Sequence, residues 1–258
     1  MELRARLVLE GAFSGRHRGV RQGPSLEFAG HRSYAPGDEW RRIDWKVFAK
    51  TDRWMVREQQ EETNLRSVLL LDVSRSMAFA SPKKLPKIQY AAILTAALGY
   101  LLIRQGESVG LGLFSDGLRF YFPPKGGGPC LARLLELLEN VRPEGTTDPA
   151  ASFQQVLQRL PRRSLVTVVS DFLGEPDGHL SAVKALLARK HEVLALQILD
   201  AEELGPLYKD LMERRLEKFE RGCVSLGVDF CRFQTHQPLD SALSLFIQKR
   251  ARTYRRAF

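Results

Sequence analysis

The chain is poor in cysteine and has no long apolar run. Its 258 residues include three cysteines, Cys130, Cys223 and Cys231, and no Cys-x-x-Cys pair. An odd number of cysteines without paired spacing argues against a disulfide framework and against a zinc site. The longest apolar stretch, residues 91–103, is broken by polar and small residues and is shorter than the roughly 20 residues that span a bilayer. The first residues also lack the apolar core of a secretory signal. These absences predict a soluble, cytoplasmic protein without a transmembrane segment.

Acidic residues are fewer than basic ones, which leaves a formal net charge of +9 and a pI of about 9.7. Such an excess attracts acidic proteins, nucleic acids or anionic membranes through long-range electrostatics. The densest basic cluster consists of Lys249, Arg250, Arg252, Arg255 and Arg256. It lacks the series of interleaved aromatic side chains that a stacking platform for bases requires. We therefore interpret the cluster as a solvated helix end, and we do not expect nucleic acid as the partner.

Residues 68–77, Val-Leu-Leu-Leu-Asp-Val-Ser-Arg-Ser-Met, form the central motif of the chain. The uncharged apolar run at its start is typical of a parallel strand that is buried on both faces of a sheet. Asp72, Ser74 and Ser76 then follow on the loop at the carboxyl end of this strand, where open α/β sheets bind their ligands. Because alternate side chains of a turning backbone can converge, these oxygen donors predict a site for a small hard cation.

Strands and helices alternate after this motif, which predicts a doubly wound, mostly parallel α/β sheet. Ser115-Asp116-Gly117 predicts a hairpin turn, and the hairpin supplies one antiparallel edge strand. Asp200 follows a predicted strand, and we interpret it as a solvated loop carboxylate. The predicted strands are 109–114, 118–122, 165–169, 193–198 and 227–233, and the predicted helices are 83–105, 131–140, 180–190, 201–222 and 239–251.

The N-terminal segment, residues 1–64, has strand and turn patterns that precede the first buried strand. All three tryptophans of the chain lie between residues 40 and 54. The segment is too short to bury much apolar surface alone. We therefore expect a β-rich segment packed on a main domain of residues 65–258, with the tryptophan rings facing inward.

Three stretches before the central motif carry a family resemblance. They are residues 27–38 (Glu-Phe-Ala-Gly-His-Arg-Ser-Tyr-Ala-Pro-Gly-Asp), 42–45 (Arg-Ile-Asp-Trp) and 56–58 (Val-Arg-Glu). With the Asp-x-Ser-x-Ser that follows, they resemble the bacterial and archaeal proteins of domain-of-unknown-function family 58 (DUF58). The resemblance covers nearly the whole chain and implies a von Willebrand factor A (vWA)-like fold without demonstrated enzymatic activity, and we expect a protein that is not an enzyme. It also implies a MoxR-type AAA+ ATPase as partner, because family members are often encoded beside one.

The resemblance further implies a complete metal-ion-dependent adhesion site (MIDAS). Its second element is a threonine after a glycine at the start of a helix, which we assign to Thr147, with Thr146 as the alternative. Helix capping by Thr147 or Asp148 is a second explanation for the same residues. The five implied ligands are Asp72, Ser74, Ser76, Thr147 and Asp171. Three hydroxyls and two carboxylates are hard oxygen donors, which suit Mg²⁺ or Mn²⁺ rather than zinc.

The ligand chemistry favours protein binding over catalysis. Two carboxylates neutralise the ion and hydroxyls donate weakly, so the cation stays electrophilic and an Asp or Glu of another protein can replace a bound water. The alternative is a Mg²⁺-dependent phosphohydrolase. The phosphatases that begin with Asp-x-Asp use the second Asp as general acid, and Ser74 holds that position here.

Overall fold

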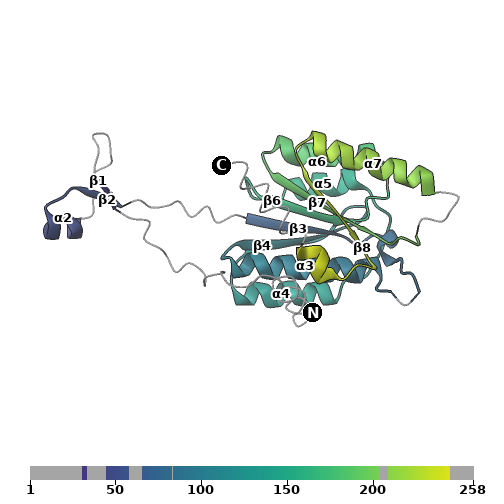
Figure 1. Ribbon diagram of the computed structural model, residues 1–258, viewed down its shortest axis with the longest axis horizontal. Helices are drawn as coiled ribbons and strands as arrows, with labels where there is room; N and C mark the ends of the chain where they lie inside the picture. The colour runs from purple at the N-terminus through teal and green to yellow at the C-terminus, as the bar shows by residue number, and fades with distance from the viewer. Residues whose placement is uncertain (1–30, 34–44, 58–65, 83, 204–208, 245–258) are drawn as a thin grey trace. The chain divides into compact units, whose positions relative to one another are not determined.

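The computed structural model describes residues 31–33, 45–57, 66–82, 84–203 and 209–244. The chain divides into two units, one of residues 20–64 and one of residues 1–19 together with 65–258. The main unit contains a six-stranded sheet with strand order β5-β4-β3-β6-β7-β8 (Figure 1). Every neighbouring pair is parallel except β4 with β5, which is antiparallel. The predicted doubly wound sheet with one antiparallel edge strand is therefore confirmed.

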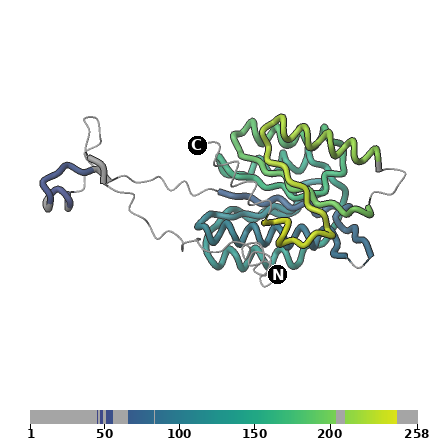
Figure 2. Tube along the Cα trace, in the orientation of Figure 1, coloured from purple at the N-terminus to yellow at the C-terminus, as the bar shows by residue number. Residues whose placement is uncertain are grey.

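The strands of this sheet are short and largely apolar. Their bounds are β3 (Arg66–Asp72), β4 (Ser108–Phe114), β5 (Leu118–Lys125), β6 (Leu165–Ser170), β7 (Glu192–Leu199) and β8 (Asp229–Gln234). The trace in Figure 2 passes from β3 outward to β4 and β5 and then returns to β6 on the other side of β3. The carboxyl ends of β3 and β6 therefore lie side by side, at the point where the strand order reverses.

Strand β3 is apolar on both sides because helices cover both faces of the sheet. Leu69 and Leu71 pack in the core formed with α3 (Lys87–Arg104) and α4 (Gly128–Glu139). Val68 and Leu70 point to the opposite core, where α5 (Pro149–Leu157), α6 (Pro176–Ala188) and α7 (Lys209–Ser225) cover the sheet (Figure 1).

Several element boundaries differ from those predicted. Helix α3 begins at Lys87 rather than at residue 83, because Pro86 fixes its own φ, disfavours helical backbone at the residue before it and stands here at the N-cap. Helix α4 begins at Gly128, three residues before the predicted start. Residues 239–244 are helical, and the rest of the helix predicted over 239–251 lies outside the described residues.

The unit of residues 20–64 contains a two-stranded antiparallel sheet of β1 (His31–Ser33) and β2 (Met55–Arg57). Its helix α2 (Trp45–Thr51) was not predicted. Trp45, Phe48 and Trp54 form an aromatic cluster with ring centroids 4.8 to 6.1 Å apart. Trp45 and Trp54 still expose 55% and 44% of their surface. Packing of residues 1–64 on the main domain stays a prediction.

Candidate functional site

Asp72 is the last residue of β3 and is fully buried. Its Oδ1 accepts a hydrogen bond from the backbone N–H of Ser74 at 2.8 Å, and its Oδ2 accepts one from the Ser170 hydroxyl at 2.6 Å. Burial and the negative charge of Asp171 raise the pKa of Asp72 to about 6, against the lowering effect of these hydrogen bonds. The carboxylate is thus held in place but lacks compensating positive charge.

The two serines of the motif lie at the start of a short 3-10 helix, η2 (Arg75–Ala78), with Ser74 at its N-cap and Ser76 within it. Ser74 is buried and Ser76 is half-buried, and their hydroxyl oxygens lie 3.1 Å apart. Asp72, Ser74 and Ser76 therefore present oxygen atoms to one small region beyond the end of β3.

Backbone hydrogen bonds attach the predicted threonine segment to this loop. The N–H of Arg75 donates to the carbonyl of Gly145 at 3.0 Å, and the N–H of Glu144 donates to the carbonyl of Val73 at 2.6 Å. Gly145 has φ +79°, and a Cβ there would lie 2.9 Å from Nη2 of Arg119. The left-handed backbone conformation is the reason that glycine is favoured here, since a side chain would be strained at this φ.

Thr146 and Thr147 follow directly after this attachment point. Thr146 is exposed and Thr147 is half-buried. Asp148 caps α5, since its carboxylate accepts a hydrogen bond from the N–H of Ala151 at 3.0 Å. The cap therefore belongs to Asp148 and not to Thr147, and the choice between the two threonines as metal ligand stays open.

Asp171 follows β6 and is buried beside the end of β3. Its Oδ2 accepts a hydrogen bond from the ammonium group of Lys87 at 2.7 Å, and its Oδ1 accepts one from the N–H of Leu173 at 3.2 Å. The same ammonium group lies 2.6 Å from both carboxylate oxygens of Glu203. Asp171 therefore has a cationic partner within the chain.

Lys87 is not among the residues predicted for the site, and its side chain is fully buried in the structure. Burying an ammonium group is costly unless it is paired with acidic groups. A lysine placed at the start of an otherwise apolar buried helix is the signal that could have identified it. Glu203, its second partner, has a raised pKa because burial outweighs the opposing charge of Lys87.

Asp200 follows β7, and its interpretation as a solvated carboxylate is wrong, because only 1% of its surface is exposed. Its carboxylate accepts hydrogen bonds from the Ser81 hydroxyl, from the Thr235 hydroxyl at 2.6 Å and from the N–H of Glu202 at 3.0 Å. Burial favours a higher pKa, but the hydrogen bonds from Ser81 and Thr235 overcome it and lower the pKa of Asp200 to about 2. Asp200 thus fastens the loop after η2 to the ends of β7 and β8.

The donor set fits a hard divalent cation in its chemistry. The potential ligand atoms of Asp72, Ser74, Ser76 and Asp171 are all oxygens. The raised pKa of Asp72 shows that its buried carboxylate lacks a positive partner, and a bound cation would stabilise its negative charge. Within the described ranges, no three His, Cys, Asp or Glu side chains form a cluster suited to a metal. The candidate site has two carboxylates, so it depends on its hydroxyls.

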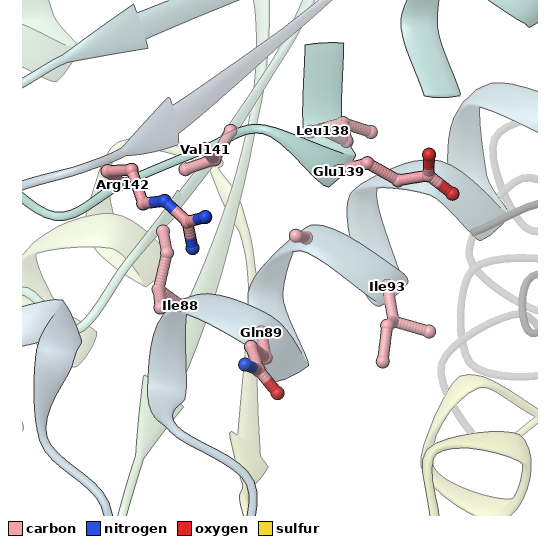
Figure 3. Close-up of a pocket in the computed structure, with 8 residues that line it drawn as sticks. Ile88, Gln89, Ile93, Leu138, Glu139, Val141 and Arg142 are labelled. Atoms are coloured by element: carbon pink, nitrogen blue, oxygen red, sulfur yellow. The ribbon is translucent and has the colours of Figure 1, made fainter. Parts of the chain in front are cut away.

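A separate groove lies between α3 and the end of α4, with a volume of about 380 Å³ (Figure 3). Its walls combine apolar side chains with three polar ones, Gln89, Glu139 and Arg142. None of the five predicted ligands lines this groove.

The sheet order, the helices on both faces and the loop cluster at the reversal point define a vWA-like α/β domain. The chain belongs to the DUF58 family, described as "Protein of unknown function DUF58", whose model matches residues 30–206. An uncharacterized protein of Mycobacterium tuberculosis, Rv1480, is 30% identical over 227 residues, which cover 87% of this chain and 70% of that protein.

Two solved structures share this fold at low sequence identity, and a third aligns more weakly. The conserved hypothetical protein BatB from Bacteroides thetaiotaomicron matches with a TM-score of 0.51 and 16% identity over 73% of this chain and 99% of its own. An aerotolerance-related membrane protein from Bacteroides fragilis matches with a TM-score of 0.50 and 15% identity over 72% and 97%. The VWA domain of SpRpn10 matches with a TM-score of 0.46 and 10% identity over 69% and 93%.

The expected cytoplasmic location is corrected by these comparisons, because a neighbour of the same fold is named as a membrane protein. Apolar runs within this chain carry no information about association with a membrane through other parts or through partners. In the described part of the chain, no helix has both the length and the apolar character needed to cross a bilayer.

Proposed function

We propose that this protein is a non-catalytic interaction domain that binds an acidic residue of a partner protein through a Mg²⁺ or Mn²⁺ ion. The observation that carries the proposal is the cluster of Asp72, Ser74 and Ser76 beside Asp171, at the point where the strand order of the sheet reverses. A vWA-like fold of the DUF58 family fits an interaction role. Thr147, or Thr146, would complete the ligand set.

The chemistry of these residues suits binding better than turnover. Ser74 and Ser76 would donate neutral oxygens, and Asp72 would supply negative charge to the cation. When bound, the cation supplies an electrophilic centre for an incoming carboxylate. Ser74 stands two residues after Asp72, where an Asp-x-Asp phosphatase has its general acid, and a serine hydroxyl cannot act as that acid.

We infer a MoxR-type AAA+ ATPase, or its client, as the partner. Family resemblance supports this choice, and the net charge of +9 would attract an acidic surface over a long range. Because one structure of the same fold is that of a membrane protein, we propose that this interaction takes place at a membrane.

The test is capture of a MoxR-type AAA+ ATPase by the purified chain with Mg²⁺, with chelator, and with the Asp72→Ala variant. We expect capture with Mg²⁺ only, and its loss in Asp72→Ala. Capture that is indifferent to both changes would remove the metal from the mechanism. Phosphate release from generic phosphoesters, abolished by Asp72→Ala, would instead favour the phosphohydrolase.

A further inference from the structure

Lys87 links the candidate metal site to a carboxylate outside it. Its ammonium group lies 2.7 Å from Oδ2 of Asp171 and 2.6 Å from Oε2 of Glu203, and the Lys87 side chain is fully buried. Asp171 comes from the loop after β6, Glu203 from the segment after β7, and Lys87 from the start of α3. Three elements thus meet at one positive charge.

The ammonium group of Lys87 lies where the nearby carboxylates would otherwise attract a metal cation. Asp171 lies close enough to Asp72 for its negative charge to act on that carboxyl group. Without the ammonium group, the buried Asp171 and the half-buried Glu203 would each have no described basic side chain paired to it, beside the buried Asp72. Like charges held together in a buried site favour the uptake of a cation.

We propose that the ammonium group of Lys87 competes with the divalent cation for Asp171, so that metal binding leaves Lys87 paired with Glu203 alone. The inference rests on the proposed metal site and goes beyond it, because it names the residue that sets the affinity of that site. Lys87 repels a cation that approaches Asp171. When Asp171 coordinates the metal, Lys87 keeps its ion pair with Glu203. A divalent cation therefore binds weakly to the isolated protein.

The competition predicts that removing the charge of Lys87 strengthens metal binding. Lys87→Met keeps the length of the side chain and removes its charge. Lys87→Met/Glu203→Gln also removes the second carboxylate that the single change leaves unpaired, and it replaces the single variant if that one does not fold. Lys84→Met is the matched control, since Lys84 pairs with the exposed Glu202 and not with Asp171.

The experiment is a calorimetric titration of Mn²⁺ into the full chain and each variant, with far-UV circular dichroism as the folding control. We expect at least tenfold tighter binding in Lys87→Met and in the double variant, no change in Lys84→Met, and loss of binding when Asp72→Ala is added. Equal or weaker binding in both Lys87 variants would overturn the competition. If that binding still disappears in Asp72→Ala, the proposed metal site stands and only the role of Lys87 is rejected.

Two further outcomes also decide the matter. Absence of Mn²⁺ binding in every chain, including the Lys87 variants, would reject both the competition and the metal-dependent function. Failure of both Lys87 variants to fold, even with millimolar Mg²⁺, would reject the competition, because the freed carboxylates should then have bound the cation and stabilised the fold.

Discussion

The ammonium group of Lys87 lies 2.7 Å from Oδ2 of Asp171, and both side chains are buried. One residue begins a helix and the other follows a strand, 84 positions apart in the sequence. An ion pair of this kind contributes little net stability when intact, but removing one partner leaves an unpaired buried charge.

Lys87→Met should therefore destabilise the protein strongly when no divalent cation is present. We expect the free energy of unfolding to fall by about 3–5 kcal/mol, because Asp171 and Glu203 both lose their partner. Urea denaturation in the presence of chelator measures the change. Lys84→Met should cost much less, since the partner of Lys84, Glu202, is exposed to solvent and such pairs contribute little. Similar losses in the two variants would contradict the importance of burial.

Substitutions of the two threonines should identify the second metal-site element. Thr147→Val removes the hydroxyl and keeps the shape, so Mn²⁺ affinity should fall by at least tenfold, whereas Thr147→Ser should keep most of it. Thr146→Val is the control and should leave the affinity within about twofold. Calorimetry would reverse the assignment if Thr146→Val alone weakens binding.

Asp200 should stabilise the fold at neutral pH and lose this contribution in acid. Its folded-state pKa of about 2 lies below the ordinary value of 3.8, so the unfolded chain binds its proton more readily. The contribution is complete above pH 3.8 and is lost as the pH falls toward 2. Asp200→Asn should lower the free energy of unfolding by about 2 kcal/mol at pH 7, and the difference from wild type should shrink near pH 2. Urea unfolding at several pH values measures this difference in the free energy of unfolding. A difference that does not change with pH would contradict the lowered pKa of Asp200.

His179 should make the fold sensitive to mild acid. Its ring packs edge-on against the stacked rings of Phe172 and Phe219, and its Nε2 is buried without a hydrogen-bond partner. Burial lowers the pKa of His179 to about 4, so only the unfolded chain takes up the proton between pH 6.5 and 4. Stability is therefore full above pH 6.5 and falls by up to about 3 kcal/mol toward pH 4.

The neutral variant His179→Gln isolates this contribution. It should unfold with a smaller dependence on pH between 6.5 and 4 than the wild type, measured as denaturant midpoints at several pH values. Parallel curves for the two proteins would show that another group causes the acid sensitivity.

The tryptophans report on the packing of the N-terminal segment. All three lie between residues 40 and 54, so fluorescence follows this segment while far-UV circular dichroism follows mainly the sheet and its helices. If the segment packs on the main domain as predicted, the two signals should change at the same temperature. An earlier fluorescence transition with an unchanged circular dichroism midpoint would contradict packing.

The sequence by itself determined the layout of the main domain. A strand buried on both faces must be apolar throughout, so Val68 to Leu71 identified β3, and the polar residues after it marked the end of the sheet that carries the candidate site. Hairpin chemistry likewise predicted the antiparallel edge, since the turn between β4 and β5 depends on local residues alone.

Only the tertiary structure decided which charges meet. Lys87, Asp171 and Glu203 come from three separate elements, and no local pattern connects them. Asp200 has the sequence context of a loop carboxylate, yet Ser81 and Thr235 reach it from distant positions and bury it. Periodicity and turn propensity act over a few residues and so can be read along the chain, whereas the partner of a buried charge depends on which loops the strand order brings together.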